Sequence, residues 1–311
     1  MDADLDEVLQ AVAEAARPRA SQGRTPSYIE SLAHADQDSF AIAVVEMDGT
    51  EHAVGDADQP VAIQSISKVF TLALAMQAAD GAEGVAEELW RRVGVEPSGD
   101  PYNSLVQLER ERGVPRNPMI NAGALVVDDV LLDHRSDAPE AVVELLSQLA
   151  GEPVTIDDLV RQETAESASR NRAIAHLMAS FGNLTHTVDE VLDAYLHQCA
   201  AAITTRQLAR AIRFLGNDGV DPATGRTVLE PERARRVAAL MLTCGTYDSA
   251  GQFAFDVGFP CKSGVSGAIV GIVRHRFGVC VWSPPLEESG NSLAGHVALH
   301  ELAQRLDLWT H

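Results

Sequence analysis

Segments with the composition of β-strands lie near both ends of this chain, and segments with a helical pattern lie between them. Two early strands are predicted at residues 39–47 and 50–54, joined by an Asp48-Gly49 turn. Two late strands are predicted at residues 267–274 and 277–282, on either side of a tight turn. Because both pairs are hairpins, a sheet built from them should be antiparallel.

Helical patterns fill most of the chain between these strand pairs. Apolar residues recur at helical spacing in the N-terminal segment and in residues 65–79. The same spacing occurs across residues 84–242 in short stretches, which are separated by Gly, Pro or Asn. The helices expected within and after that region are 121–132, 139–149, 156–161, 170–181, 187–199, 204–215, 231–242 and 291–306.

These two patterns together predict an α/β fold of the α+β type. An antiparallel sheet built from both chain ends should be flanked by helices and joined to a mainly helical subdomain. We expect a single domain, 1–311, with a sheet subdomain at about 1–80 and 243–311 and a helical subdomain at about 81–242. The cleft between the two parts is the expected ligand site.

The balance of charges excludes some classes of partner. The chain has 45 acidic and 24 basic residues, and its net charge is −21. Nucleic acids and anionic membranes bind clusters of Lys and Arg, so neither partner is expected. No apolar run approaches the ~20 residues that a membrane span needs. The acidic start of the chain is unlike a secretory signal, and we therefore expect a cytoplasmic protein.

No residue pattern points to a metal or an organic cofactor. The four cysteines lack a CxxC spacing, so they are expected to be buried free thiols rather than disulfides or metal ligands. The ten histidines are interpreted as ordinary surface or core residues.

Lysine is almost absent from the sequence. Only two of the 24 basic residues are lysines, Lys68 and Lys262. A buried Lys can lose its proton, whereas Arg effectively cannot, so both are candidates for proton transfer. Lys68 follows Ser65 by three residues, a spacing that places both on one helix face. SxxK at a helix start is typical of the penicillin-recognising serine enzymes, in which a base activates the serine. Lys262-Ser263-Gly264 is similar to their KTG element.

Longer blocks of sequence carry a resemblance to one family. QSISKVFTL, NPMINAGA, CGTYDSAGQFAFDVGFPCKSGVSG and WSPPLEESGNS resemble the serine-dependent glutaminases, and the resemblance runs from about residue 28 to residue 306. It implies the β-lactamase-like, penicillin-recognising fold and the hydrolysis of L-glutamine to L-glutamate and ammonia. It also implies a homodimer or homotetramer that needs no cofactor.

The resemblance also implies roles for single residues. Ser65 matches the nucleophile, Lys68 its proton-transfer partner and Tyr247 a tyrosine beside the nucleophile. Val265 matches a substrate-binding position whose backbone N–H faces the substrate carbonyl. The other matched substrate-binding positions are Tyr28, Gln64, Asn121, Asn171 and Tyr195.

One position departs from the family pattern. The family has a glutamate seven residues before the position of Asn171, where it helps to bind the substrate's amino group, and this chain has Thr164 there. Glu163 lies one residue earlier and Glu166 two residues later. If the preceding loop carries one extra residue, Glu163 takes the role, and this is the assignment that we favour. A site for a zwitterionic amino acid should contain a carboxylate, because an unpaired buried ammonium is costly.

Each candidate residue also has a plainer interpretation. SxxK arises by chance on many helices, and Lys262 fits the edge of a strand. Asn121 fits a helix N-cap, Tyr195 a core aromatic residue and Val265 an ordinary strand residue. Only the occurrence of the whole set, in order, favours a site over these alternatives.

The resulting mechanism has two steps. Ser65 attacks the side-chain amide carbon of glutamine while Lys68, with Tyr247, takes its proton, and water then cleaves the acyl-enzyme. Backbone N–H groups of Ser65 and Val265 would stabilise the oxyanion. Two rival functions remain. The first is a β-lactam hydrolase or D-Ala-D-Ala peptidase on the same fold, which the missing SDN element and the missing export signal disfavour. The second is a descendant that binds an amino acid without catalysis, and the presence of Thr164 in place of the family glutamate would agree with it.

Overall fold

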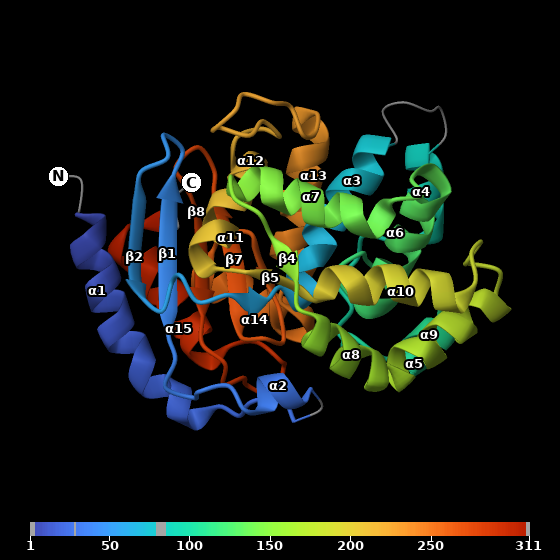
Figure 1. Ribbon diagram of the computed structural model, residues 1–311, viewed down its shortest axis with the longest axis horizontal. Helices are drawn as coiled ribbons and strands as arrows, with labels where there is room; N and C mark the ends of the chain where they lie inside the picture. The colour runs from blue at the N-terminus through green and yellow to red at the C-terminus, as the bar shows by residue number, and fades with distance from the viewer. Residues whose placement is uncertain (1–3, 28, 79–84, 309–311) are drawn as a thin grey trace.

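The computed structural model describes residues 4–27, 29–78 and 85–308. Its main sheet has five strands in the order β2-β1-β8-β7-β6, and every neighbouring pair is antiparallel. The sheet occupies one side of the molecule and a group of helices the other (Figure 1). The bounds are β1 (Ala41–Glu46), β2 (Glu51–Gly55), β6 (Cys261–Ser263), β7 (Ala268–Val273) and β8 (Phe277–Trp282).

Both predicted hairpins are present. Strand β1 pairs with β2 across the Asp48-Gly49 turn, where Gly49 has a φ of 95° that favours glycine. Strand β7 pairs with β8, and β8 also pairs with β1, so the sheet joins segments from both chain ends. The α/β fold with an antiparallel sheet and a mainly helical part is therefore confirmed, whereas the exact subdomain bounds stay a prediction.

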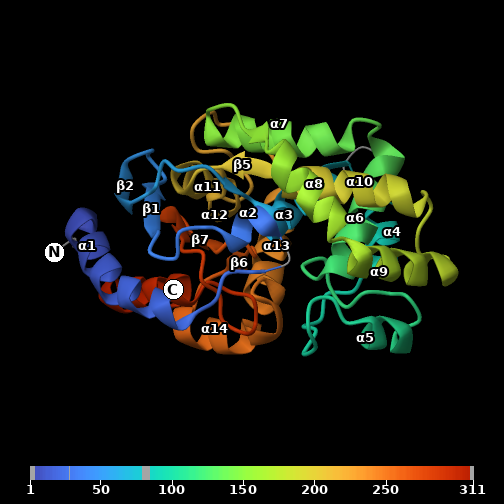
Figure 2. The same ribbon diagram turned by 60° about the horizontal axis from the view of Figure 1, so that its bottom comes forward.

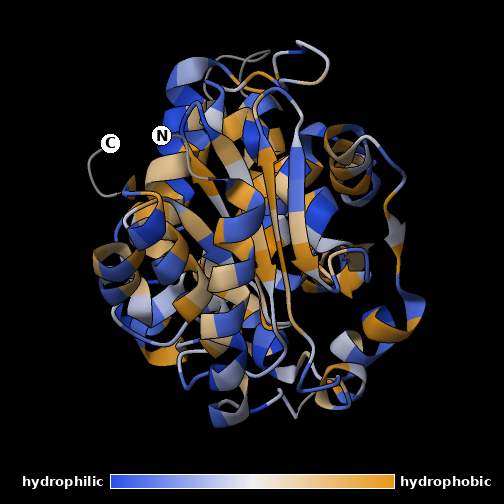
Figure 3. Cartoon of the chain, turned by 90° about the vertical axis from the view of Figure 1, so that its left-hand side faces the viewer, coloured by the Kyte–Doolittle hydropathy of each residue, from blue (hydrophilic) through white to orange (hydrophobic). Residues whose placement is uncertain are grey.

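The two faces of the sheet bury different residues because side chains alternate along each strand. Ile42 and Val44 of β1 face a cluster formed with helices α1 (Leu5–Ala16), α14 (Ala250–Val257) and α15 (Leu293–Arg305). Ala41 and Ala43 face the larger core that the helical part shares. The outer face is covered by α1 and α15, which lie side by side (Figures 1 and 2). Hydrophobic residues concentrate in the central strands (Figure 3).

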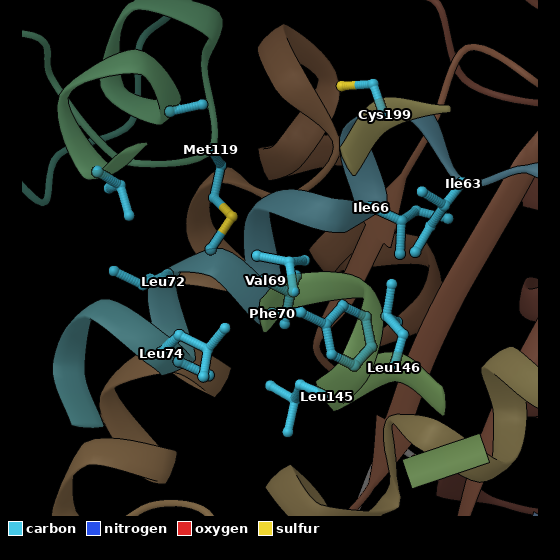
Figure 4. Packing of buried hydrophobic residues seen from close by; sticks show 14 of the residues in the cluster. Ile63, Ile66, Val69, Phe70, Leu72, Leu74, Met119, Leu145, Leu146 and Cys199 are labelled. Atoms are coloured by element: carbon cyan, nitrogen blue, oxygen red, sulfur yellow. The ribbon is translucent and has the colours of Figure 1, made fainter. Parts of the chain in front are cut away.

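Helix α3 (Ser67–Ala78) lies at the centre of the larger core. Its residues from Ser67 to Met76 are all buried, so the helix is surrounded by other elements. Val69, Phe70 and Leu72 pack among buried side chains from several elements, including Leu145 and Leu146 (Figure 4).

The remaining helices form the rest of the fold. Some of them pack against α3 or lie against the inner face of the sheet, and the others pack on those helices or on one another. They are α2 (Glu30–Ala33), α4 (Val85–Arg92), α5 (Leu105–Arg110), α6 (Asn121–His134), α7 (Ala138–Ala150), α8 (Asp158–Glu166), α9 (Ser169–Ser180), α10 (Val188–Cys199), α11 (Thr205–Ala211), α12 (Arg213–Gly216) and α13 (Pro231–Cys244).

A second, small sheet corrects one predicted helix. Residues 156–161 were expected to be helical, but β4 (Thr155–Ile156) pairs with β5 (Ala201–Ile203), which also pairs with β3 (Val61–Ala62). Helix α8 begins only after Asp157, whose carboxylate accepts a hydrogen bond from the N–H of Val160 at 3.0 Å. An N-cap of this kind fixes where a helix starts, so the preceding residues are free to pair as a strand.

Two further differences concern element bounds. The helix expected at 204–215 is divided into α11 and α12, with Ile212 between them. Lys262 was expected just before a strand and instead lies within β6. None of the helices in the described part of the chain is long and apolar enough to cross a membrane.

Candidate active site

A cavity of about 210 Å³ contains most of the residues that the sequence singled out. Its wall comes from the start of α3, the start of α6, helices α8 to α10 and the turn after β6. The lining residues are Ile29, Gln64, Ser65, Tyr102, Asn103, Asn121, Thr164, Ser167, Ala168, Arg170, Asn171, Tyr195, Cys199 and Val265. Tyr28 lies outside the described residues.

Ser65 stands at the entry to the central helix. Gln64, Ser65 and Ile66 form a short 3-10 turn that continues into α3, and Gln64 has a φ of 48°. A positive φ at a residue other than glycine is strained and is often found at functional sites. Ser65 is 7% exposed and faces the cavity. Its hydroxyl therefore stands on a buried, well-fixed element at the cavity wall.

Lys68 lies one turn farther along α3, with its amine buried among neutral groups. Its Nζ donates to Oδ1 of Asn121 at 2.7 Å and to the carbonyl oxygen of Met119 at 3.3 Å. It also lies 5.7 Å from the ring centroid of Tyr195. Burial lowers the pKa of Lys68 to about 8, because desolvation disfavours the charged amine. A substantial fraction of this lysine is therefore neutral near pH 8 and able to accept a proton.

Asn121 connects Lys68 to the substrate side of the cavity. Its Nδ2 donates to Oδ1 of Asn171 at 2.8 Å, and its Oδ1 also accepts from the hydroxyl of Tyr195 at 3.4 Å. Asn121 is the first residue of α6, and the N-cap is Ile120, so its side chain is engaged with the site and not with the helix end. Tyr195 is both a core residue and a lining residue, so its place in the core leaves its substrate-binding role a prediction.

The NPMINAGA block folds into a tight turn that positions Asn121. The Oδ1 of Asn117 accepts from the backbone N–H groups of Met119 and Ile120 at 3.0 and 3.2 Å. A Cβ at Gly123 would lie 1.9 Å from the carbonyl oxygen of Asn117, so only glycine lets this turn pack against α6.

Tyr247 and Lys262 form a second buried group beside Ser65. Tyr247 has a φ of 62°, and its hydroxyl donates to the carbonyl oxygen of Ser263 at 3.2 Å. Lys262 lies 4.3 Å from the Tyr247 ring centroid and donates to the carbonyl oxygens of Gly245 and Ser263 at 2.9 and 2.6 Å. Burial raises the pKa of Tyr247, and a hydrogen bond to Ser65 opposes that rise. Burial also lowers the pKa of Lys262 well below its usual value.

The turn after β6 brings Val265 to the cavity wall. A Cβ at Gly264 would lie 2.9 Å from the carbonyl oxygen of Ile63, so the missing side chain allows this turn to approach the segment before Ser65. Val265 and Ser65 thus line the same cavity although 200 positions separate them in the sequence.

Lys68 and Tyr247 are buried behind the cavity wall and do not line it. Among the described residues that were predicted to bind substrate, Glu163 is the one that does not line the cavity. Its Oε2 accepts from the backbone N–H and the hydroxyl of Ser31 at 2.9 and 2.6 Å. Thr164 lines the cavity instead. Helix α8 is continuous through both residues, and consecutive helical residues point about 100° apart, so they face different surroundings. Glu163 therefore points toward Ser31 and not into the cavity.

Several lining residues had no assigned role in the sequence. Tyr102 lines the cavity and lies against Tyr247, with ring centroids 4.6 Å apart. Arg170 is the only charged residue in the described wall, and its Nε donates to the carbonyl oxygen of Asn103 at 3.0 Å. Cys199 also lines the cavity, and burial raises its pKa to about 11. Arg170 could have been found from the sequence, because it is next to the predicted site residue Asn171. Tyr102 lies in a loop, and no sequence pattern pointed to it.

One group of side chains in the described part of the chain has a geometry suited to a metal ion. Asp129, Asp133 and His186 come close together away from the cavity. Arg92 pairs with Asp129 there and lies 3.9 Å from Asp133, so a guanidinium already neutralises these carboxylates. His296 and His300 are one turn apart on α15, but His300 bonds to the backbone oxygen of Asp256 and His296 stacks on Phe253. These groups are explained by packing and ion pairing.

Comparisons with known proteins agree on one family. The family model described as Glutaminase matches residues 23–311. A curated relative named Glutaminase, from Methylobacterium nodulans, is 48% identical over 307 residues, with 97% of each chain covered. A relative of the same name from Rhizobium rhizogenes is 47% identical over 307 residues, again with 97% of each chain covered.

Solved structures agree with the sequence comparisons. The structure of the probable glutaminase ybaS has a TM-score of 0.89 and 35% identity, with 98% of both chains covered. A probable glutaminase from Bacillus subtilis, solved in complex with 6-diazo-5-oxo-L-norleucine, has a TM-score of 0.87 and 32% identity, with 100% of this chain and 98% of that chain covered.

Proposed function

Since this chain belongs to the glutaminase family and is a glutaminase, which converts L-glutamine to L-glutamate, we propose that it does so through an acyl-enzyme on Ser65. The observation that carries the proposal is the juxtaposition of Ser65, at the wall of the cavity, with two buried lysines and a buried tyrosine. A serine hydroxyl is a weak nucleophile unless a neighbouring base takes its proton.

Lys68 is the proposed base. Burial lowers its pKa to about 8, and its amine has neutral hydrogen-bond partners. As the Ser65 Oγ–carbon bond forms, the hydroxyl proton passes to Lys68. The carbon–nitrogen bond then breaks, and ammonia leaves with a proton returned by Lys68 or Tyr247. Water next attacks the ester carbon and gives a proton to the same pair. The ester bond then breaks, the pair returns a proton to Oγ of Ser65, and glutamate leaves.

Tyr247 is proposed to take part because its hydroxyl interacts with both Ser65 and the backbone of Ser263. The raised pKa of Tyr247 favours the neutral phenol, which can donate a proton to a leaving amine. Lys262 lies over the face of the Tyr247 ring and donates to the carbonyl oxygens of Gly245 and Ser263, which holds this segment in place.

The backbone N–H groups of Ser65 and Val265 are the proposed oxyanion donors. The close approach that Gly264 permits supports this assignment. Donors of this kind stabilise the transition state by about 3–4 kcal/mol each. The proposed substrate contacts are Gln64, Asn121, Asn171 and Tyr195, together with Tyr28. The Nε2 of Gln64 is buried and has no hydrogen-bond partner among the described residues, which leaves it able to donate to a ligand.

The test is ammonia release from L-glutamine by the wild type and by Ser65→Ala. We expect Ser65→Ala to lose at least about 1,000-fold in kcat, since removal of a catalytic nucleophile leaves only the contributions of binding and the oxyanion donors. Mass spectrometry should detect an ester on Ser65 in the wild type only. A Ser65→Ala enzyme that keeps its rate would exclude the proposed nucleophile.

Two further assays separate the rival functions. L-Asparagine and D-glutamine measure how strictly the cavity selects the chain length and the hand of the substrate. Turnover of a chromogenic β-lactam would favour the β-lactam hydrolase. Tight binding of glutamine without turnover would favour the non-catalytic alternative.

We also propose that the protein is cytoplasmic and forms a homodimer or homotetramer. The resemblance to the glutaminase family supports the proposed assembly. Light scattering of the purified full chain measures the assembly, and fractionation of cells that produce it measures the location.

A further inference from the structure

The described part of the cavity wall has no acidic residue to pair with the ammonium group of an amino-acid substrate. Among the described lining residues there is no Asp or Glu, and the charged member is Arg170. Thr164, which is 9% exposed, lines this cavity, and its buried hydroxyl has no hydrogen-bond partner among the described residues. An unsatisfied buried hydroxyl indicates that a ligand atom or a water completes it.

The two carboxylates near Thr164 on α8 are engaged elsewhere. Glu163 accepts two hydrogen bonds from Ser31 of α2. These bonds lower the pKa of Glu163 and favour its ionised form. Glu166 is exposed, and its Oε1 accepts from Nε2 of Gln162 at 2.9 Å. Neither residue lines the cavity.

The chemistry of the wall does not favour an ammonium group. A hydroxyl can accept one hydrogen bond from an ammonium but supplies no countercharge, and an unpaired ammonium in a buried site is costly. Arg170 attracts a carboxylate and repels a second cation. The Thr164 hydroxyl, unlike a carboxylate, can also donate to an oxygen atom on the substrate.

We infer that this enzyme also hydrolyses ω-amides of carboxylic acids whose α-carbon carries no ammonium group, in the same cavity as glutamine. The inference rests on the proposed Ser65 acyl-enzyme. The bonds are the same as for glutamine: Ser65 Oγ adds to the amide carbon, ammonia leaves, and water hydrolyses the ester to the dicarboxylate. The Thr164 side chain and the absence of a carboxylate in the described wall set this tolerance.

The probe is glutaramate (5-amino-5-oxopentanoate), which is glutamine with a hydrogen in place of the α-ammonium. The measured quantity is the ratio of kcat/KM for L-glutamine to kcat/KM for glutaramate. A site built to bind a polar group rejects an analogue without it by about 10⁴–10⁵-fold, whereas a site that does not pair the group discriminates by about 100-fold or less. We expect a wild-type ratio below about 100-fold, and a larger ratio overturns the inference.

Variants on α8 locate the cause. Thr164→Glu places a carboxylate at the wall and is expected to raise the ratio at least about tenfold. Glu163→Gln is expected to change the ratio less than about threefold. Glu166→Gln is the matched control, because it removes an exposed carboxylate from the same helix. A tenfold fall in the ratio on Glu163→Gln would assign the ammonium to Glu163 and overturn the inference.

Two measurements keep the outcomes distinct. If Thr164→Glu fails to fold, the wild-type ratio and the Glu163→Gln ratio still decide. Ser65→Ala is assayed with both amides, so that failure of the Ser65 mechanism can be told apart from failure of the inferred substrate tolerance. Loss of both activities supports a shared nucleophile, and retained glutamine turnover would refute the Ser65 mechanism itself.

Discussion

Lys68 holds its amine in surroundings that disfavour a positive charge. It is 2% exposed, and its hydrogen-bond partners are an amide oxygen and a backbone oxygen. The nearby carboxyl of Asp128 is itself buried, and burial raises its pKa well above the usual value, so it provides little compensating charge. Arg could not replace Lys68, because a guanidinium does not lose its proton in this range.

The lowered pKa of Lys68 predicts the pH dependence of the reaction. If the neutral amine is the active form, kcat/KM for glutamine should rise tenfold per pH unit below about pH 8 and level off above it. The measurement is a pH profile of ammonia release between pH 6 and 10. Lys68→Arg should abolish both the activity and the rise, and a wild-type profile that stays flat across this range would exclude the lysine as base.

Tyr102 is expected to act by positioning Tyr247, since the two rings pack with centroids 4.6 Å apart. Tyr102→Ala should lower kcat about 10–100-fold, because a positioned proton donor loses its support and catalytic geometry is sensitive to small displacements. Tyr102→Phe keeps the ring and should retain kcat within about threefold. Equal losses in both variants would point to the hydroxyl and not to the packing.

At the scale of elements, the inner face of the sheet depends on a close approach between β8 and α11. A Cβ at Gly278 would lie 2.2 Å from the carbonyl oxygen of Ala209 and 2.8 Å from Cγ2 of Ile212. Gly278 pairs with Val45 and Ile272, so it stands in the middle of the sheet. The helix layer can therefore approach the sheet only because this strand residue has no side chain.

Gly278→Ala should lower the free energy of unfolding by about 1–3 kcal/mol, the usual cost of overpacking a core. Gly251→Ala is the matched control, because this exposed glycine in α14 has no atom near its potential Cβ. That change should be neutral or stabilise by up to about 1 kcal/mol. Denaturant unfolding of both variants measures the difference, and equal stabilities would refute the packing argument.

At the scale of the whole molecule, the net charge of −21 makes the folded chain repel itself. Many surface arginines form local pairs, such as Arg206 with Asp58 and Arg274 with Asp218, but they do not balance the excess of acid. Exposed pairs contribute little individually, so the long-range repulsion is the larger effect at low salt.

Raising NaCl from 0.05 to 0.5 M should therefore raise the Tm by several degrees, because salt screens the repulsion more than it weakens the exposed pairs. Calorimetry at neutral pH measures the shift. The same salt series near pH 4.7, the sequence pI, should show a much smaller shift because the net charge is close to zero there. A Tm that falls with salt at neutral pH would contradict this prediction.

The sequence by itself determined the hairpins, the antiparallel sheet and the candidate Ser65 and Lys68, because alternation, turn residues and helical spacing are local properties. The tertiary structure decided which side chains reach the cavity. Thr164 and not Glu163 faces it because the rotation of α8 depends on the Asp157 cap and on packing. Tyr102 reaches Tyr247 from a distant loop. The strand at 155–156 was missed because its partners, β5 and then β3, come from other parts of the chain. Contacts between distant segments leave no local pattern, so only the folded chain reveals them.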